Sequence, residues 1–250
     1  MASEKVKRIE AFKKLMEIAK SGSVELYGTT EADIYSDARS WPVHWEKDLG
    51  NGRFENEQDK QRALNYTLEC LVTVDFPSSV EQLKKEKELT RLILDAGADP
   101  NHDYRFHNRN IFDDFLLTEK HHMALEVAKT KGFLGPGKPF KIFDHLACKL
   151  AYYLEWKCPF PGGCLTTDDK EKTALYIQDC SDQKEIVYTL FQKGIYPCNQ
   201  DIFTKLVPIV LEKDPEFFDK RKEQTITQLK HAKTPVQIYK ALMGKRKEKN

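Results

Sequence analysis

Apolar residues recur along this chain at helical spacing, in blocks separated by turn-forming residues. The first block places its apolar residues three or four positions apart, with lysines between them. They are Val6, Ile9, Phe12, Leu15, Met16 and Ala19. This spacing puts them on one face of an amphipathic helix over residues 4–20. Ser21-Gly22-Ser23 follows and ends the predicted helix, because these residues favour turns.

Two further helices are predicted over residues 59–72 and from about Glu81 to Asp95. The loop Asp75-Phe76-Pro77-Ser78-Ser79 precedes the second of them, and we expect a serine hydroxyl there to cap this helix by accepting a bond from its free amides. Gly97 follows the same helix and suits its C-terminus, because glycine adopts the left-handed backbone conformation at low cost.

The least regular part of the sequence is residues 22–59, which contain Trp41-Pro42 and a Gly50-Asn51-Gly52 turn. No helical or strand period runs through it, so the pattern does not settle its structure. Trp41, Trp45 and Tyr35 form an aromatic cluster there, and we interpret this cluster as part of a core.

A family resemblance rests on the segment from Glu88 to Asn101, which reads ELTRLILDAGADPN. It resembles the second helix and exit turn of an ankyrin repeat. The segment from Glu185 to Asn199 has the same layout, and its Gly194 follows Gly97 at nearly three repeats of about 33 residues each. Thr173-Ala174-Leu175-Tyr176 resembles the TPLH opening of the first helix, with alanine and tyrosine in place of proline and histidine. We therefore expect a helix pair within residues 172–199.

The register between these segments is marked by two near copies, Ile111-Phe112-Asp113-Asp114 and Ile142-Phe143-Asp144-His145. Asp201-Ile202-Phe203-Thr204 echoes them. Each of the three is expected to open the first helix of a repeat. The matching second helices are predicted at residues 122–129, ending at Gly132, and at residues 149–156.

The resemblance implies an all-α fold, an ankyrin-like helical-repeat solenoid with non-repeat caps at both ends. We expect an N-terminal helical cap and irregular region over 1–59, and about five divergent repeats over 60–215. Residues 216–250 would hold capping helices, near 216–231 and 235–243, and a basic tail. Such stacking is required because one helix pair cannot bury its apolar face alone.

Composition narrows the class of protein. The chain has 250 residues with a net charge of +1, so no global field attracts nucleic acid or an anionic membrane. No stretch reaches the roughly 20 apolar residues of a membrane span, and the charged N-terminus lacks the apolar core of a signal peptide. The six cysteines are scattered, which favours reduced thiols and a cytoplasmic protein.

Divergent repeats with non-repeat ends resemble bacterial and viral effectors of ankyrin type. If the protein is such an exported effector, we expect it in the host cytoplasm.

No chemical motif stands out. Cys158 and Cys164 lack zinc-ribbon spacing, and the lysine in Gly135-Pro136-Gly137-Lys138-Pro139 lacks the spacing of a phosphate-binding loop. His121 and His122 are interpreted as solvated helix-start residues. The run of residues 84–88 interleaves lysine with glutamate and is typical of an exposed helix face. We therefore expect no catalytic residue, metal, cofactor or nucleic acid. A cysteine-dependent hydrolase or transferase with its site in the non-repeat regions remains the alternative.

A connector between two predicted repeats supplies the candidate partner-binding residues. They are Tyr104, Arg105, Phe106, His107 and Arg109. Tyrosine and arginine combine a large contact area with hydrogen bonding, so they are favoured at protein interfaces. The alternative is that Tyr104 and Phe106 pack on the next repeat. In the ankyrin family a concave face of first helices and finger tips binds a folded partner, and the resemblance implies a monomeric scaffold that binds another protein in this way.

Overall fold

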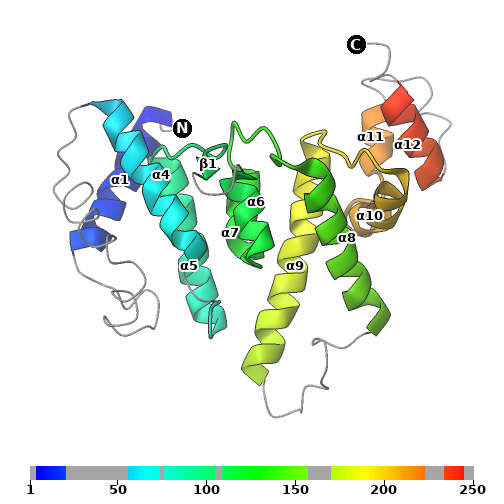
Figure 1. Ribbon diagram of the computed structural model, residues 1–250, viewed down its shortest axis with the longest axis horizontal. Helices are drawn as coiled ribbons and strands as arrows, with labels where there is room; N and C mark the ends of the chain where they lie inside the picture. Colours follow the sequence, from blue (N-terminus) through cyan, green and yellow to red (C-terminus); the bar gives the residue numbers. More distant parts are fainter. Residues whose placement is uncertain are drawn as a thin grey trace. The chain divides into compact units, whose positions relative to one another are not determined.

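The computed structural model describes residues 4–20, 56–73, 76–104, 109–156, 170–222 and 234–244. Within these ranges the chain is mostly helical, so the predicted all-α class is confirmed (Figure 1). The helices are α1 (Glu4–Lys20), α4 (Glu57–Thr73), α5 (Val80–Ala96), α6 (Ile111–Leu117), α7 (His121–Lys129), α8 (Pro139–Trp156), α9 (Lys170–Gln192), α10 (Gln200–Lys213), α11 (Phe217–Lys222) and α12 (Pro235–Gly244). Strands β1 (Asp103–Tyr104) and β2 (Arg109–Asn110) form one small sheet.

The chain divides into two compact units. Unit 1 comprises residues 1–137 and 165–179, and unit 2 comprises residues 138–164 and 180–250. The division falls inside α9, between Asp179 and Cys180. The irregular region over 21–55, with its tryptophans, lies outside the described residues, as do residues 223–233 of the predicted C-terminal caps.

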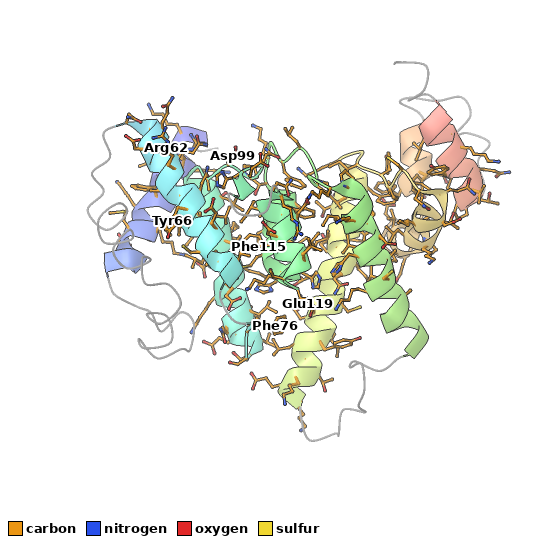
Figure 2. The ribbon with its side chains drawn as sticks, in the orientation of Figure 1. Arg62, Tyr66, Phe76, Asp99, Phe115 and Glu119 are labelled. Carbon is orange, nitrogen blue, oxygen red and sulfur yellow. The ribbon has the colours of Figure 1, made fainter. Side chains whose placement is uncertain are left out.

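Unit 1 contains two antiparallel helix pairs, α4–α5 and α6–α7. Helix α5 packs against α1, α4 and α7, and α6 packs against α7 and α4. The first helices of the two pairs are therefore neighbours, and so are the second helices. In Figure 2, Arg62 and Asp99 lie at one end of this layer, and Phe76 and Glu119 lie at the opposite end. The turns within pairs and the connectors between pairs thus occupy opposite ends.

The apolar faces of these helices form a dry core. Leu68, Ile93, Phe112, Phe115 and Val127 have no measurable solvent exposure. Burying one such side chain stabilises the folded state by about 1.5–3 kcal/mol. These five residues come from all four helices, so each pair covers the apolar face of the other.

The predicted helix ends are confirmed where the signal is local. Ser79 is the N-cap of α5, and its hydroxyl accepts a bond from the backbone N–H of Gln82. Gly97 has φ of 120° and Gly194 has φ of 77°. The amide after each glycine donates to a carbonyl five residues back, at 3.1 Å from Ala98 and 2.9 Å from Ile195. Both helices therefore end in the same six-residue motif with a glycine of positive φ.

The start of α7 contradicts the sequence-based prediction. Lys120, His121 and His122 are buried instead of solvated, with exposures of 4%, 1% and 1%. Lys120 Nζ donates to the carbonyl of Val72 at 2.6 Å. His121 Nδ1 lies 2.7 Å from Asp179 Oδ1, and His122 Nε2 lies 2.7 Å from Glu86 Oε2. Burial is possible because each polar head finds a partner on another segment.

His122 bonds through one of its two ring nitrogens. Nε2 faces the Glu86 carboxylate, whereas Nδ1 is buried without a hydrogen-bond partner. The other oxygen of Glu86 accepts from Gln82 Nε2 at 3.1 Å. This carboxylate is thus a buried link between α5 and α7.

In unit 2, α8 and α12 pack on α10. An aromatic cluster forms the core there, with the rings of Phe191 and Phe203 5.5 Å apart and those of Phe217 and Phe218 5.0 Å apart. Asn199 caps α10 by accepting bonds from the backbone N–H groups of Asp201 and Ile202. The predicted opening of a helix at residue 201 is confirmed.

Two predicted helix pairs are wrong. Residues 172–192 form one continuous helix, α9, instead of a pair, and residues 142–156 lie in one continuous helix, α8. The sequence between the expected pair members explains this, because residues 177–184 and 146–148 contain no glycine or proline to break a helix. The segment that most resembles an ankyrin repeat is therefore not a helical hairpin.

Replacing Glu86 with alanine should destabilise the protein strongly, because His122 and Gln82 would lose their buried acceptor. We expect the free energy of unfolding to fall by about 1–3 kcal/mol, measured by urea denaturation followed by circular dichroism. The double variant Glu86→Met with His122→Leu should recover most of this loss, because it removes both polar groups together. A double variant as unstable as Glu86→Ala would contradict this account.

Gly132→Ala should test backbone strain alone. Gly132 has φ of 90°, and a Cβ atom there would meet nothing within 4 Å. We expect a loss of about 1–2 kcal/mol in unfolding free energy, since L-residues with side chains are strained at positive φ. Gly132→Asn should cost less, because asparagine tolerates this region better. Equal costs for the two variants would argue against strain as the cause.

Candidate binding surface

A groove of about 1040 Å³ lies where the N-terminal half of α1 meets the C-terminal ends of α5 and α7. Helices α1 and α7 both pack against α5, and the C-terminal end of α5 forms the base of the groove. We call it the α5 groove. Its lining residues are Lys5, Lys7, Arg8, Gln61, Arg91, Leu94, Asp95, Gly97, Ala98, Asp99, Pro100, Glu126, Lys129, Thr130 and Lys131. Leu94 and Ala98 lie at its base and are buried.

Side-chain bonds to the backbone fix the loops beside the groove. Asn65 Oδ1 accepts from the backbone N–H of Asp99 at 2.8 Å. The Asp99 carboxylate in turn accepts from the backbone N–H of Asn101 at 2.9 Å, which closes a local turn. The Asn101 side chain then reaches the next loop, donating to Gly132 O at 2.9 Å and accepting from Leu134 N at 2.7 Å. The loops after α5 and α7 are therefore tied together.

The β1–β2 hairpin is anchored at its base. Its strands pair Asp103 with Asn110 and Tyr104 with Arg109 in antiparallel register. The Asn110 side chain caps α6 by accepting from Asp113 N at 2.9 Å, and it donates to Gly135 O at 2.8 Å. One asparagine thus fixes the hairpin to both α6 and the loop that follows α7.

The charges of the α5 groove are unbalanced. Six cationic side chains line it against three anionic ones, Asp95, Asp99 and Glu126. Five of the cations form no ion pair within the described part of the chain: Lys5, Lys7, Arg8, Arg91 and Lys129. They are exposed. The excess of exposed positive charge makes the groove attractive to an anionic ligand.

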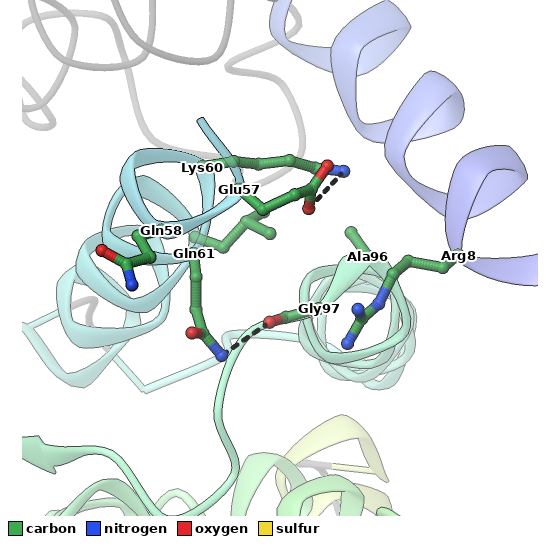
Figure 3. Close-up of a pocket in the computed structure, with 8 residues that line it drawn as sticks. Arg8, Glu57, Gln58, Lys60, Gln61, Ala96 and Gly97 are labelled. Atoms are coloured by element: carbon green, nitrogen blue, oxygen red, sulfur yellow. Dashed lines mark hydrogen bonds and ion pairs between the residues drawn. The ribbon is translucent and has the colours of Figure 1, made fainter. Parts of the chain in front are cut away.

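A smaller pocket of about 130 Å³ adjoins the groove, and Arg8, Gln61 and Gly97 line both (Figure 3). The Gln61 amide donates to Gly97 O at 3.4 Å. The Arg8 side chain extends from α1 toward Gly97, and a Cβ atom added at Gly97 would lie 3.0 Å from its Nε. Gly97 therefore serves both the helix exit and the close approach of Arg8.

The predicted partner-binding residues are only partly described. Arg105, Phe106 and His107 lie outside the described residues, and Tyr104 is placed in β1 by its backbone alone. Arg109 belongs to β2, and its Nη1 lies 3.7 Å from the buried carboxylate of Asp114. Part of this guanidinium is thus used within the chain, while 31% of the side chain is exposed. Their role in binding stays a prediction.

The sequence pattern did not reveal the α5 groove. Its cations come from α1, α5 and the end of α7, where each appears as an ordinary exposed lysine or arginine. The interleaved run over residues 84–88 was interpreted as an exposed face, and Glu86 in that run is fully buried.

No set of three or more metal-ligating side chains lies close enough to hold an ion in the ranges that the structure describes. None of the described helices is long and apolar enough to cross a bilayer. Comparisons with family models, with curated proteins and with solved structures give no match for this chain.

The pair formed by Lys14 and Glu88 attaches α1 to α5, with 2.5 Å between Lys14 Nζ and Glu88 Oε1. The hydrogen bond from Lys14, with attraction by Lys14 and Arg91, outweighs desolvation and lowers the pKa of Glu88. The stabilisation is therefore present above the ordinary glutamate pKa and is lost as the pH falls through the lowered value.

A double-mutant cycle with Lys14→Ala and Glu88→Ala should give a coupling free energy of about 0.2–1 kcal/mol at pH 7. The value is small because both side chains are half exposed and screened by solvent. Urea denaturation at decreasing pH should show the coupling disappear once the pH lies below the lowered pKa of Glu88. Coupling that stays constant as the pH falls through this range would show that charge on Glu88 is not its source.

Proposed function

We propose that this protein is a binding scaffold for another protein, built on stacked helix pairs. The observation that supports this proposal is the α5 groove, where five exposed cations on three packed helices form no ion pair with the described residues. Residues that serve stability are paired elsewhere in the same unit, as His122 and Lys120 are. Unpaired charge on a rigid surface favours recognition of a partner.

The layering of unit 1 supports a divergent ankyrin-type stack. The helices α4 and α6 are neighbours, α5 and α7 are neighbours, and a hairpin connects the two pairs. We propose that this stack covers the two pairs of unit 1 and that the β1–β2 hairpin corresponds to a finger between repeats. By this resemblance the hairpin and the first helices form a second contact surface, carried by Tyr104, Arg105, Phe106, His107 and Arg109.

The alternative of a cysteine-dependent enzyme has no supporting observation in the described ranges. Cys148 Sγ lies 4.0 Å from Asp144 Oδ1, and three of the histidines, His102, His121 and His122, bond to carboxylates. A nucleophilic cysteine needs a base such as histidine beside it. The scaffold therefore explains more of the observed geometry.

The scaffold proposal is tested by affinity capture with the intact chain as bait. We expect a partner protein at a fixed stoichiometry, and we expect Tyr104→Ala with Arg105→Ala to reduce its binding at least tenfold by calorimetry, because truncating interface anchors removes most of the contact energy. Phe76→Ala, at the opposite end of the helix layer, serves as the matched control. Absence of any stoichiometric partner would contradict the scaffold, and unchanged binding by the double variant would exclude the hairpin as its contact.

A further inference from the structure

The five unpaired cations surround the groove from different helices. Lys5, Lys7 and Arg8 belong to α1, Arg91 lies on α5, and Lys129 lies on the last turn of α7. Helix α5 packs against both α1 and α7, so the cations stand on both sides of its exit turn. A ligand that lies along this turn would therefore meet positive charge on each flank.

The groove is large and offers little apolar surface. Leu94 and Ala98 are buried at its base, and Pro100 beside them is half-buried. Its volume of about 1040 Å³ is that of the largest small-molecule pockets. Positive charge distributed over three helices of such a groove matches an extended segment with several negative charges better than a small anion.

The negatively charged groups of the groove favour a polypeptide ligand over a nucleic acid. Asp95 and Glu126 lie among the cations, and the C-terminal ends of α5 and α7 add partial negative charge. A nucleic acid carries a charge on every phosphate and would meet these groups unfavourably. A polypeptide instead spaces its carboxylates between apolar side chains and supplies N–H donors for the helix-end carbonyls.

We infer that the α5 groove binds an acidic polypeptide segment of a partner protein, with its carboxylates against Lys7, Arg91 and Lys129. This inference rests on the proposed function and names the chemistry of the partner. The side chain of Asn101 already joins the loops beside the groove through its bonds to Gly132 and Leu134. Because these loops are ordered before the ligand arrives, binding costs little further conformational entropy.

The probe is a phage-displayed library of random 12-residue peptides, panned on the intact chain in low salt. We expect enriched peptides to carry several Asp or Glu residues. A synthetic enriched peptide should bind in fluorescence anisotropy, and its affinity should fall as NaCl is raised, because exposed charges are screened.

Matched variants locate the site. Lys7→Glu with Arg91→Glu should weaken the peptide at least tenfold, and the neutral pair Lys7→Gln with Arg91→Gln should weaken it by a smaller factor. Lys13→Glu with Lys84→Glu changes the same net charge on exposed lysines of the same two helices outside the groove, and should have little effect. Circular dichroism confirms that each variant is folded.

Three outcomes would overturn the inference. Enriched peptides without net negative charge would exclude an acidic ligand. Equal weakening by the groove and control pairs would show a general charge effect. Tighter binding of a 12-residue single-stranded oligonucleotide than of the peptide, lost in the groove variant, would assign the groove to nucleic acid. If any of these outcomes occurs while affinity capture still yields a partner protein, the scaffold proposal stands. If the intact chain binds neither a partner protein nor an acidic peptide, both proposals are wrong.

Discussion

The structure of unit 1 depends on one constraint, which is that neither of its helix pairs can bury its apolar face alone. The pair α6–α7 consists of helices of only 7 and 9 residues, far too short to be stable in isolation. They are held because α7 packs on α5 and α6 packs on α4, which removes Phe112, Phe115 and Val127 from water. The buried link from Glu86 to His122 adds a polar contact with a defined geometry between the same helices.

The same constraint positions the binding surface. Stacking brings the loops after α5 and α7 side by side, and the Asn101 side chain joins them through two backbone bonds. Helix α1 then lies along α5, where Lys14 pairs with Glu88 and Arg8 approaches Gly97. The α5 groove therefore consists of elements that are each fixed by packing, and its cations are held together on a surface that the fold itself does not neutralise. This is the physical basis of the proposed scaffold function.

Sequence reasoning succeeded where the signal is local and failed where it is not. Ser79 and Gly97 mark the ends of α5 through bonds that span a few residues, so both were predictable. The continuity of α9 was not predicted, because the interpretation relied on the resemblance of residues 173–176 to the first helix of a repeat. The absence of any glycine or proline between residues 170 and 193 indicates one continuous helix. Buried His121 and His122 could not be recognised, since their carboxylate partners lie 58 and 36 residues away along the chain. The groove was missed for the same reason, because its cations become neighbours only after the helices pack.

Amide hydrogen exchange measured by mass spectrometry tests the stacking of α4–α5 with α6–α7 most directly. If each pair covers the apolar face of the other, the amides of α5 and α7 should be protected to a similar extent and should open together in one cooperative step. The short helices α6 and α7 should then show the protection of the whole unit. Rapid exchange throughout α6 and α7, while α5 stays fully protected, would show that the pairs do not depend on each other and would contradict the account.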